Sequence, residues 1–370
     1  MTEPFDPSIK DILPHEKMYN IQIGTERFTL SGASLSYDAP SYFTNYFSQE
    51  GNAEKTLYID RSPDVFRLIY SHLQGYYLQI DDPDTYTKVF IDSLYYNLPR
   101  LRALILNSDY YFANIGGTPF KIPKQFLSGS GNTPNFFTIG SEVIYKDISD
   151  VIFNMNWIRP PPQAATTLNR CDVLFKELML ALQGVDIKFR SEDHRRALIR
   201  EARYYRFNGL VQKLVKHKIS YNPFTKREEI IMGLEYLDPK GITLSEAESP
   251  VLYQRPFVDD KPRPLVIQID DPEIEVQTSG KVIGHYKTGK LLAKLFKAYG
   301  DFIEDGECVF NLILSPGVLP LNLGKLTLLR CLIAPIVIED FNRPPKLGMK
   351  VLKADVAVNE QDLYKDTKFL

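Results

Sequence analysis

Histidine and cysteine side chains are the residues of this chain that could act as metal ligands, nucleophiles or proton carriers. The sequence has five histidines and three cysteines, and the cysteines are Cys171, Cys308 and Cys331. They are far apart and form no Cys-x-x-Cys pair, and neither a His-Glu-x-x-His nor a Gly-x-Ser-x-Gly motif occurs. We therefore expect no metal, no cofactor, no disulfide framework and no catalytic residues. The odd number of thiols fits a reducing compartment.

Two other patterns resemble ligand-binding loops. Gly116-Gly117 follows an apolar run, as in a phosphate-binding loop, but another short strand follows it and no Gly-Lys-Ser/Thr sequence occurs. The glycine pair is therefore predicted to turn a strand hairpin. The acidic stretch at 301–307 lacks the alternating spacing of a calcium loop and is predicted to be a solvated turn.

Three polar features are predicted to be structural. His72 lies within an apolar helical pattern and is expected in the core. Arg61 is expected to bond to Asp60 or to the backbone in preference to a ligand. The Asp193-His194 pair stands where a helix is predicted to begin, and we expect it to cap that helix.

A basic amphipathic helix is predicted at 288–299. Lys290, Lys294 and Lys297 fall on one of its faces, and leucines fall on the other. Such a helix can lie on an anionic membrane or in a partner's groove, but it more often covers a sheet with its charged face in solvent. We favour the sheet-covering helix and keep peripheral membrane binding as an alternative.

The charge and hydropathy of the chain restrict its class. Its 370 residues include 44 basic and 46 acidic side chains, and this near-neutral balance disfavours a protein that binds nucleic acid by neutralising phosphates. No charge-free segment reaches the ~20 residues that span a bilayer. The leader at 1–17, expected to be flexible, resembles neither a secretory signal nor a mitochondrial presequence. We therefore expect an intracellular protein, cytoplasmic or nuclear.

An internal repeat organises the first 220 residues. Residues 61–80 align with residues 170–189 without a gap at an offset of 109, and residues 23–30 match residues 115–122 at an offset of 92. Because the offset grows, the second copy carries about 17 inserted residues, which we place near 147–167. Several matches in the same order indicate a duplication.

Each copy is predicted to be a strand hairpin followed by a cluster of helices. In the first copy, strands are expected at 19–23 and 27–30. Ser62 and Pro63 are typical of a helix start and Gly75 of a helix end. The predicted helices span residues 65–73, 83–96 and 99–106 in the first copy, and residues 175–182, 192–205 and 209–217 in the second.

These motifs resemble the BTB/POZ domains of the tetramerisation (T1) type, which occur in potassium-channel N-termini and in soluble KCTD-like proteins. Residues 114–120, Asn-Ile-Gly-Gly-Thr-Pro-Phe, are similar to the family's N-V-G-G-x-x-F opening. Residues 59–66, Ile-Asp-Arg-Ser-Pro-Asp-Val-Phe, are similar to its I-D-R-D-P-x-x-F box, and residues 73–75 to its L-R-T-G end. The resemblance covers most of residues 18–220 as two domains in tandem, as in uncharacterised fungal BTB proteins.

The residues that match the family's motifs are expected to be structural. They are Gly24, Phe28, Pro40, Phe43, Phe47, Asp60, Arg61, Phe66, Gly75, Gly116, Gly117, Phe120, Arg170, Phe175 and Gly184. The chain departs from the family at Gly24-Thr25, where a glycine pair is expected, and at 169–171, where the second copy lacks D-R-D-P. The zinc-binding cysteines of some family members are absent, since Cys171 stands by itself in this half. No membrane span is predicted, which disfavours a channel.

The final residues, 221–370, match neither copy. Short β-rich runs predict a mixed, mostly β domain, so the expected class is α+β. The predicted division is a leader at 1–17, a first BTB/POZ-like domain at 18–107, a second at 109–220 and a β-rich domain at 221–370.

The resemblance implies a non-enzymatic protein that binds other proteins and associates with itself, with a cullin-type ubiquitin-ligase adaptor as one version. Two copies in one chain could also satisfy each other's interface and leave a monomer. An enzyme with a site in residues 221–370, or a membrane-associated protein using the helix at 288–299, are the alternatives. Partners are expected to be proteins, without nucleic acid or metal.

Overall fold

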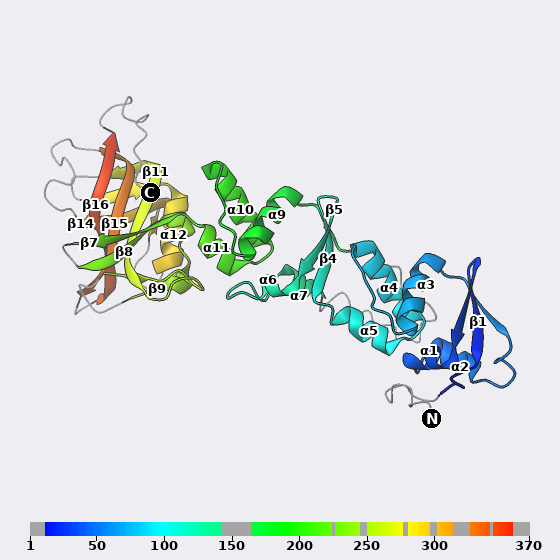
Figure 1. Ribbon diagram of the computed structural model, residues 1–370. Coiled ribbons are helices and arrows are strands. Elements are labelled where there is room, and N and C mark those ends of the chain that lie inside the picture. The colour runs from blue at the N-terminus through cyan, green and yellow to red at the C-terminus, as the bar shows by residue number, and fades with distance from the viewer. Residues whose placement is uncertain are drawn as a thin grey trace. The chain divides into compact units, whose positions relative to one another are not determined.

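The computed structural model of the chain describes residues 12–141, 164–223, 226–244, 250–276, 280–296, 302–313, 326–340 and 343–357. The chain divides into two compact units, residues 1–207 and residues 208–370 (Figure 1). Helices and strands are both abundant, in agreement with the expected α+β class. Most of the expected insertion at 147–167 and of the leader at 1–17 lies outside the described residues.

The first unit begins with a small sheet. β1 (Met18–Ile23) pairs antiparallel with β2 (Glu26–Ser31) and parallel with β3 (Thr56–Ile59), which gives the order β2-β1-β3. Alternate residues of β1 point to the core, so Tyr19 and Ile21 are buried. The expected strands at 19–23 and 27–30 are confirmed.

Helices complete this part of the first unit. They are α1 (Gly32–Tyr37), α2 (Tyr42–Phe47), α3 (Pro63–Leu73), α4 (Pro83–Tyr95) and α5 (Pro99–Leu106). The last three begin at a proline, whose fixed φ suits the first helical position, as the sequence predicted. α1 and α2 were not predicted. They have six residues each, which is too short for an apolar period to stand out, and each begins at a serine that caps its N-terminus, Ser31 or Ser41.

The same order of elements recurs in the second half of this unit. β4 (Tyr110–Ile115) pairs antiparallel with β5 (Thr118–Pro123) and parallel with β6 (Thr167–Leu168). The helices are α6 (Lys124–Leu127), α7 (Phe136–Ser141), α9 (Asp172–Leu182) and α10 (Glu192–Tyr204). We refer to residues 18–107 as the first module and residues 109–207 as the second module.

Equivalent contacts hold the two modules. The backbone N–H of Tyr42, at the start of α2, donates to the carbonyl oxygen of Tyr96 at 2.8 Å. The N–H of Phe136, at the start of α7, donates to the carbonyl oxygen of Tyr205 at 3.0 Å. In both modules a short helix is therefore tied to the end of a long one by the same hydrogen bond.

The hairpin turns require glycine for two reasons. Gly24 and Gly116 have φ of +54° and +57°, a region that favours glycine. A Cβ on Gly116 would also lie 2.5 Å from the carbonyl oxygen of Arg170, and a Cβ on Gly24 would lie 3.2 Å from that of Arg61. The glycines thus let each hairpin approach the segment that carries the motif arginine.

The second unit consists mostly of strands. The longest are β11 (Arg263–Val276), β14 (Glu307–Ile313), β15 (Leu326–Asp340) and β16 (Arg343–Ala357), with the shorter β12 (Lys281–Gly284). β11 pairs with β15 and β12, β15 with β16, β16 with β14, and β14 with β12. These pairings close the strands into a ring. β8 (Arg227–Gly233) adds to β11 in parallel, and β7 (His217–Asn222) pairs with β8.

Short elements complete the second unit. They are α11 (Asn208–Leu214), β9 (Ile242–Thr243), β10 (Leu252–Tyr253), β13 (Ile303–Glu304), and the 3₁₀ turns η2 (Leu234–Tyr236) and η3 (Pro239–Gly241). The division between the compact units precedes α11, whose sequence counterpart in the first module is α5.

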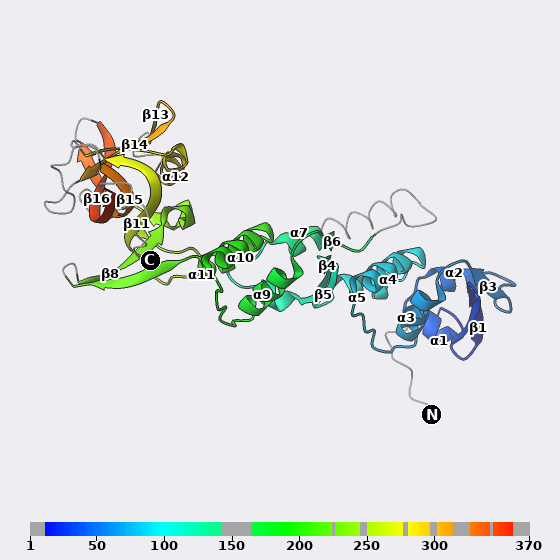
Figure 2. The ribbon, with the colours of Figure 1, turned by 90° about the horizontal axis from the view of Figure 1, so that it is seen from above.

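The predicted basic helix is α12 (Tyr286–Phe296), which lies beside β14 (Figure 2). Leu292 and Phe296 are buried, whereas Lys290 and Lys294 are exposed. This is the arrangement of a helix that covers a sheet; Lys297 lies outside the described residues. Within the described ranges, no helix combines the length and the apolar character needed to cross a membrane.

Candidate functional site

The motif arginine of the first module is held inside the fold. Arg61 follows β3 and forms an ion pair with Asp92 of α4, while its guanidinium carbon lies 4.6 Å from the centre of the Tyr95 ring. The Asp92 carboxylate is buried, and this burial raises its pKa even though the charge and hydrogen bond of Arg61 act to lower it. Asp60, one of the two partners expected from the sequence, is exposed. The carboxylate partner of Arg61 is thus Asp92, and Asp60 was the wrong choice.

The second module repeats this cluster. The Nε of Arg170 donates to Oε2 of Glu201 at 3.2 Å, and its guanidinium carbon lies 4.4 Å from the centre of the Tyr204 ring. The hydrogen bond to Glu201 raises the pKa of Arg170. In both modules the arginine and its carboxylate are 31 positions apart. We call each set of arginine, carboxylate and tyrosine the anchor of its module.

The sequence contained a signal for the missed carboxylates. At the offset of 109 that aligns Arg61 with Arg170, Asp92 aligns with Glu201, so an acid replaces an acid. An arginine inside a fold needs a carboxylate partner. Two positions of the predicted helices are acidic in both copies, and the position of Asp92 and Glu201 is one of these two candidates. The anchors use the charge of both arginines for internal contacts, which favours the structural role expected for these residues.

The remaining motif residues lie in the core or at turns. Phe43, Phe66 and Phe175 are fully buried, and Phe28 and Phe47 are nearly so. Phe28 meets Phe66 edge-on at 4.8 Å between ring centres, and Phe120 meets Phe175 in the same way at 4.9 Å. Gly75 and Gly184 follow α3 and α9, and Gly117 lies in a hairpin turn. These three glycines have positive φ. Pro40 precedes α2.

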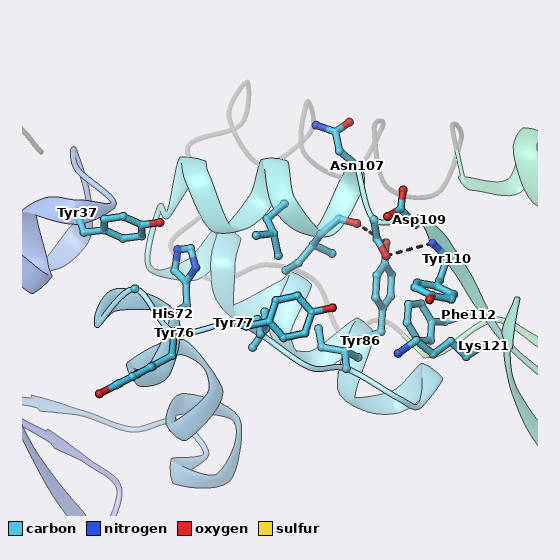
Figure 3. Close-up of a pocket in the computed structure, with 16 residues that line it drawn as sticks. Tyr37, His72, Tyr76, Tyr77, Tyr86, Asn107, Asp109, Tyr110, Phe112 and Lys121 are labelled. Atoms are coloured by element: carbon cyan, nitrogen blue, oxygen red, sulfur yellow. Dashed lines mark hydrogen bonds between the residues drawn. The ribbon is translucent and has the colours of Figure 1, made fainter. Parts of the chain in front are cut away.

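A tyrosine-lined cavity of about 520 Å³ opens in the first unit (Figure 3). Its five tyrosines come from four segments of the chain, and they are Tyr37, Tyr76, Tyr77, Tyr86 and Tyr110. Tyr86 forms part of the floor, where its ring stacks on Phe112 at 4.6 Å and its hydroxyl donates to the carbonyl oxygen of Ile105 at 3.1 Å. Tyr76 and Tyr77 project into solvent, with 67% and 87% of their surface exposed. Such walls can hold an apolar or aromatic group.

His72 lines one side of this cavity and belongs to a buried polar cluster. Its Nε2 lies 2.9 Å from Oδ2 of Asp38, which is completely buried. The same carboxylate accepts the backbone N–H groups of Arg100 and Leu101 at 2.6 and 2.8 Å. Asp38 thereby caps α5, because the residue before that helix, Leu98, has no side-chain acceptor. His72 is buried, as expected, but sequence reasoning missed its partner Asp38.

Lys121 belongs to the polar lining of the cavity, and its partner Asp81 lies next to it. The Nζ of Lys121 donates to Oδ1 of Asp81 at 2.8 Å and lies 4.6 Å from the centre of the Tyr110 ring. Hydrogen bonds from Lys121 and Gln79 lower the pKa of Asp81. The polar lining therefore offers a charge-paired group beside apolar walls. This arrangement suits the binding of a protein side chain.

The other predicted polar features lie elsewhere. α10 is capped by Ser191, whose Oγ accepts the N–H of His194 at 3.1 Å, so the expected capping role of the Asp193-His194 pair was wrong. His194 contacts Glu177, with Nε2 and Oε2 2.8 Å apart. Among the residues that the structure describes, no group of three or more histidine, cysteine or acidic side chains is placed to hold a metal ion.

The second unit contains a buried ion pair. Nη2 of Arg255 donates to Oδ1 of Asp259 at 2.7 Å, and both side chains are almost fully buried. Burial raises the pKa of Asp259, but hydrogen bonds and the charges of Arg255 and Arg263 outweigh it, so the pKa is lowered. Nearby, burial raises the pKa of Tyr253 to about 12. Its hydroxyl accepts the N–H of Asp238 at 3.1 Å.

Comparison with known proteins gives two yeast relatives. The chain is 40% identical over 334 residues to the uncharacterized protein YDR132C of Saccharomyces cerevisiae, and the match covers 74% of this chain and 67% of that protein. It is 39% identical over 239 residues to the BTB/POZ domain-containing protein YLR108C of the same yeast, covering 65% of this chain and 49% of the relative. The chain thus spans about half the length of the second relative. No family model and no solved structure matches it.

Proposed function

The chain belongs to the family of the yeast protein YDR132C, and on that premise we propose that it is a non-enzymatic protein-interaction protein with two tandem BTB/POZ-like modules. The relative named as a BTB/POZ domain-containing protein supports a BTB/POZ domain in this chain. The T1-like, KCTD-like character and the predicted domains at 18–107, 109–220 and 221–370 are part of this proposal.

One observation carries the proposal. The same order of strands and helices, closed by the same arginine–carboxylate–tyrosine anchor, occurs twice in residues 18–207. Because the anchors pair their charges internally, the polar motif residues do not converge on a substrate. The second module also exposes large apolar side chains on one helix, of which Val173 and Leu180 are 52% and 45% exposed. Exposed apolar patches are typical of surfaces that bind proteins.

The activity we propose is self-association, with recruitment of a second protein as its purpose. The tyrosine-lined cavity is the proposed recruiting site, because Tyr76 and Tyr77 project from it. A cullin-type ubiquitin-ligase adaptor is one version of this function, and an intracellular location is part of it. Residues 221–370 would add a further binding surface.

Co-capture of two tagged forms of the full chain tests self-association. We expect that, when both forms are produced in one cell, capture through the first tag recovers the second. Mixing separately purified forms is the control for adventitious sticking, since forms that have already associated with themselves should exchange slowly and give much lower recovery. Failure to recover the second form from cells that produce both would contradict self-association.

Proximity labelling tests recruitment. The full chain and its Tyr76→Ala, Tyr77→Ala double variant would each carry the labelling enzyme in the same cells. We expect a set of proteins that the unchanged chain labels and the variant labels several-fold less. Identical labelling by both would contradict recruitment through the tyrosine-lined cavity.

A further inference from the structure

The two modules differ on the outer face of one helix. α3 and α9 align at the offset of 109, and the core positions keep their character, as at Phe66 and Phe175. Two outer positions, one heptad apart, change from polar to apolar. Asp64 of α3 corresponds to Val173 of α9, and Ser71 corresponds to Leu180. Val173 and Leu180 are 52% and 45% exposed, so burial within the second module does not explain them.

The modules also differ in the side chain that covers the strand next to this helix, which is β2 beside α3 and β5 beside α9. In the first module the ring of Tyr70 lies 5.4 Å from that of Phe28, and its hydroxyl donates to the carbonyl oxygen of Thr29 at 3.3 Å. Tyr70 thereby fills the space between α3 and β2, and Phe28 is 7% exposed. In the second module the corresponding residue is Met179, which has no ring to place there.

A groove remains at this position of the second module. It has a volume of about 300 Å³ and is lined by residues of β5, α6 and α9. Phe120, Ile122, Phe126, Met179 and Leu180 form its apolar lining. We define the α9 patch as this groove together with the neighbouring exposed side chain of Val173. The first module shows that the fold itself does not require an apolar surface here.

We infer that the α9 patch is where two copies of this chain meet, with the exposed aliphatic side chains of each copy entering the groove of the other. The inference rests on the proposed self-association and names the surface responsible. A twofold contact requires a surface that complements itself. The α9 patch carries exposed aliphatic side chains, Val173 and Leu180, which we call the ridge, next to the groove that Leu180 also lines.

The charges around the patch favour a second copy as the occupant. Lys176 pairs with Asp172, with Nζ and Oδ2 3.1 Å apart, and Lys121 pairs with Asp81 at 2.8 Å. Because each of these lysines has its own carboxylate, two identical patches can approach without the repulsion that unpaired like charges would cause. A stable homodimer buries roughly 1,200–2,000 Å² or more. The paired lysines would therefore form the polar rim of a larger interface centred on the apolar side chains.

The test transfers the first module's residues to the second. In the full chain, Val173→Asp with Leu180→Ser makes the ridge polar, and Met179→Tyr fills the groove as Tyr70 does. Light scattering over a concentration series measures the dissociation constant of the dimer. We expect each change to weaken association at least tenfold. Tyr58→Ser, which alters an exposed aromatic residue of the first module, is the matched control and should leave association unchanged.

The outcomes separate the patch from the proposed function. If the unchanged chain is a dimer and the patch variants dimerise equally well, with unchanged far-UV circular dichroism, the α9 patch is not the contact. Self-association then still stands. A monomeric unchanged chain overturns self-association itself. If that monomer captures a different protein and the patch variants lose it, the occupant is that protein and the second-copy inference is wrong. If the double variant unfolds, the dissociation constant of the Met179→Tyr variant tests the patch instead, because this substitution adds no charge.

Discussion

Arg61 and Arg170 illustrate how single residues define this fold. Each guanidinium contacts both a carboxylate and a tyrosine ring of α4 or α10, so that burial, charge and stacking act on one side chain. The Arg61 pair is the more buried of the two, with 19% and 6% of the two side chains exposed against 32% and 10% for the Arg170 pair.

Removing Arg61 should destabilise the first module strongly. Arg61→Ala leaves the buried Asp92 carboxylate without its partner, and loss of one member of a buried pair costs about 3 kcal/mol or more. Hydrogen exchange of the peptide that contains α4, measured in the full chain, should show faster opening. Arg67→Ala is the matched control, because Arg67 is 55% exposed and its ion pairs are worth at most about 1 kcal/mol. Equal effects of the two changes would contradict the anchor's role.

Asp259 should make the second unit sensitive to acid. Its folded-state pKa lies below the unfolded value of 3.8, so its ion pair with Arg255 contributes stability at pH values above 3.8. That contribution is lost as the pH falls through the lower, folded-state pKa. Denaturant unfolding between pH 2 and pH 7 should therefore show Asp259→Asn much less stable than the unchanged chain at neutral pH and nearly equal to it at the acid end. A constant difference across this range would refute the assignment.

The sequence predicted that these polar residues have structural roles, but it did not predict the residues with which they pair. His72 was expected in the core and is buried, but the Asp38 carboxylate that fixes it lies 34 positions away. Similarly, Arg61 was expected to bond to its neighbour Asp60 or to the backbone, whereas its carboxylate partner is Asp92. Periodicity reports which face of a helix is apolar, whereas a partner across the core depends on how helices pack. For the two arginines, only the comparison of the two copies could have indicated the carboxylate partners.

At the scale of elements, hairpins and proline-started helices were predictable, since local residues determine them. The short helices α1 and α2 were not, because six residues show no period. The closure of β11, β12, β14, β15 and β16 into a ring was also not predictable. It depends on pairings such as that of β14 with β16, which brings Leu312 beside Met349. Alternation of apolar residues predicts strands without naming their neighbours.

The packing of α12 on β14 yields a prediction at this scale. A Cβ on Gly289 would lie 2.7 Å from the carbonyl oxygen of Phe302 and 3.1 Å from the Cα of Cys308. Although alanine is the better helix former, Gly289→Ala should destabilise the second unit by about 1–3 kcal/mol, because the helix must move away from the sheet. Gly140→Ala in α7 is the control, since a Cβ there meets nothing within 4 Å. Thermal unfolding of both variants measures the contrast; a stabilised Gly289→Ala chain would show that α12 packs differently.

At the scale of the whole molecule, the two modules share their order of elements but differ in their outer surfaces. The first module covers its outer strand with Tyr70 and presents polar residues on α3, whereas the second leaves a groove and presents aliphatic residues on α9. On the proposed function, the module with the apolar outer face forms the contact between chains, and the surfaces of the other module are left for a further partner.

The mass of the full chain in solution tests this account most directly. Sedimentation equilibrium over a hundredfold range of concentration requires neither tags nor variants. We predict a mass of at least twice the 42.5 kDa of one chain at the upper concentrations, falling toward one chain on dilution. A mass of 42.5 kDa at every concentration would contradict the claim that the chain associates with itself.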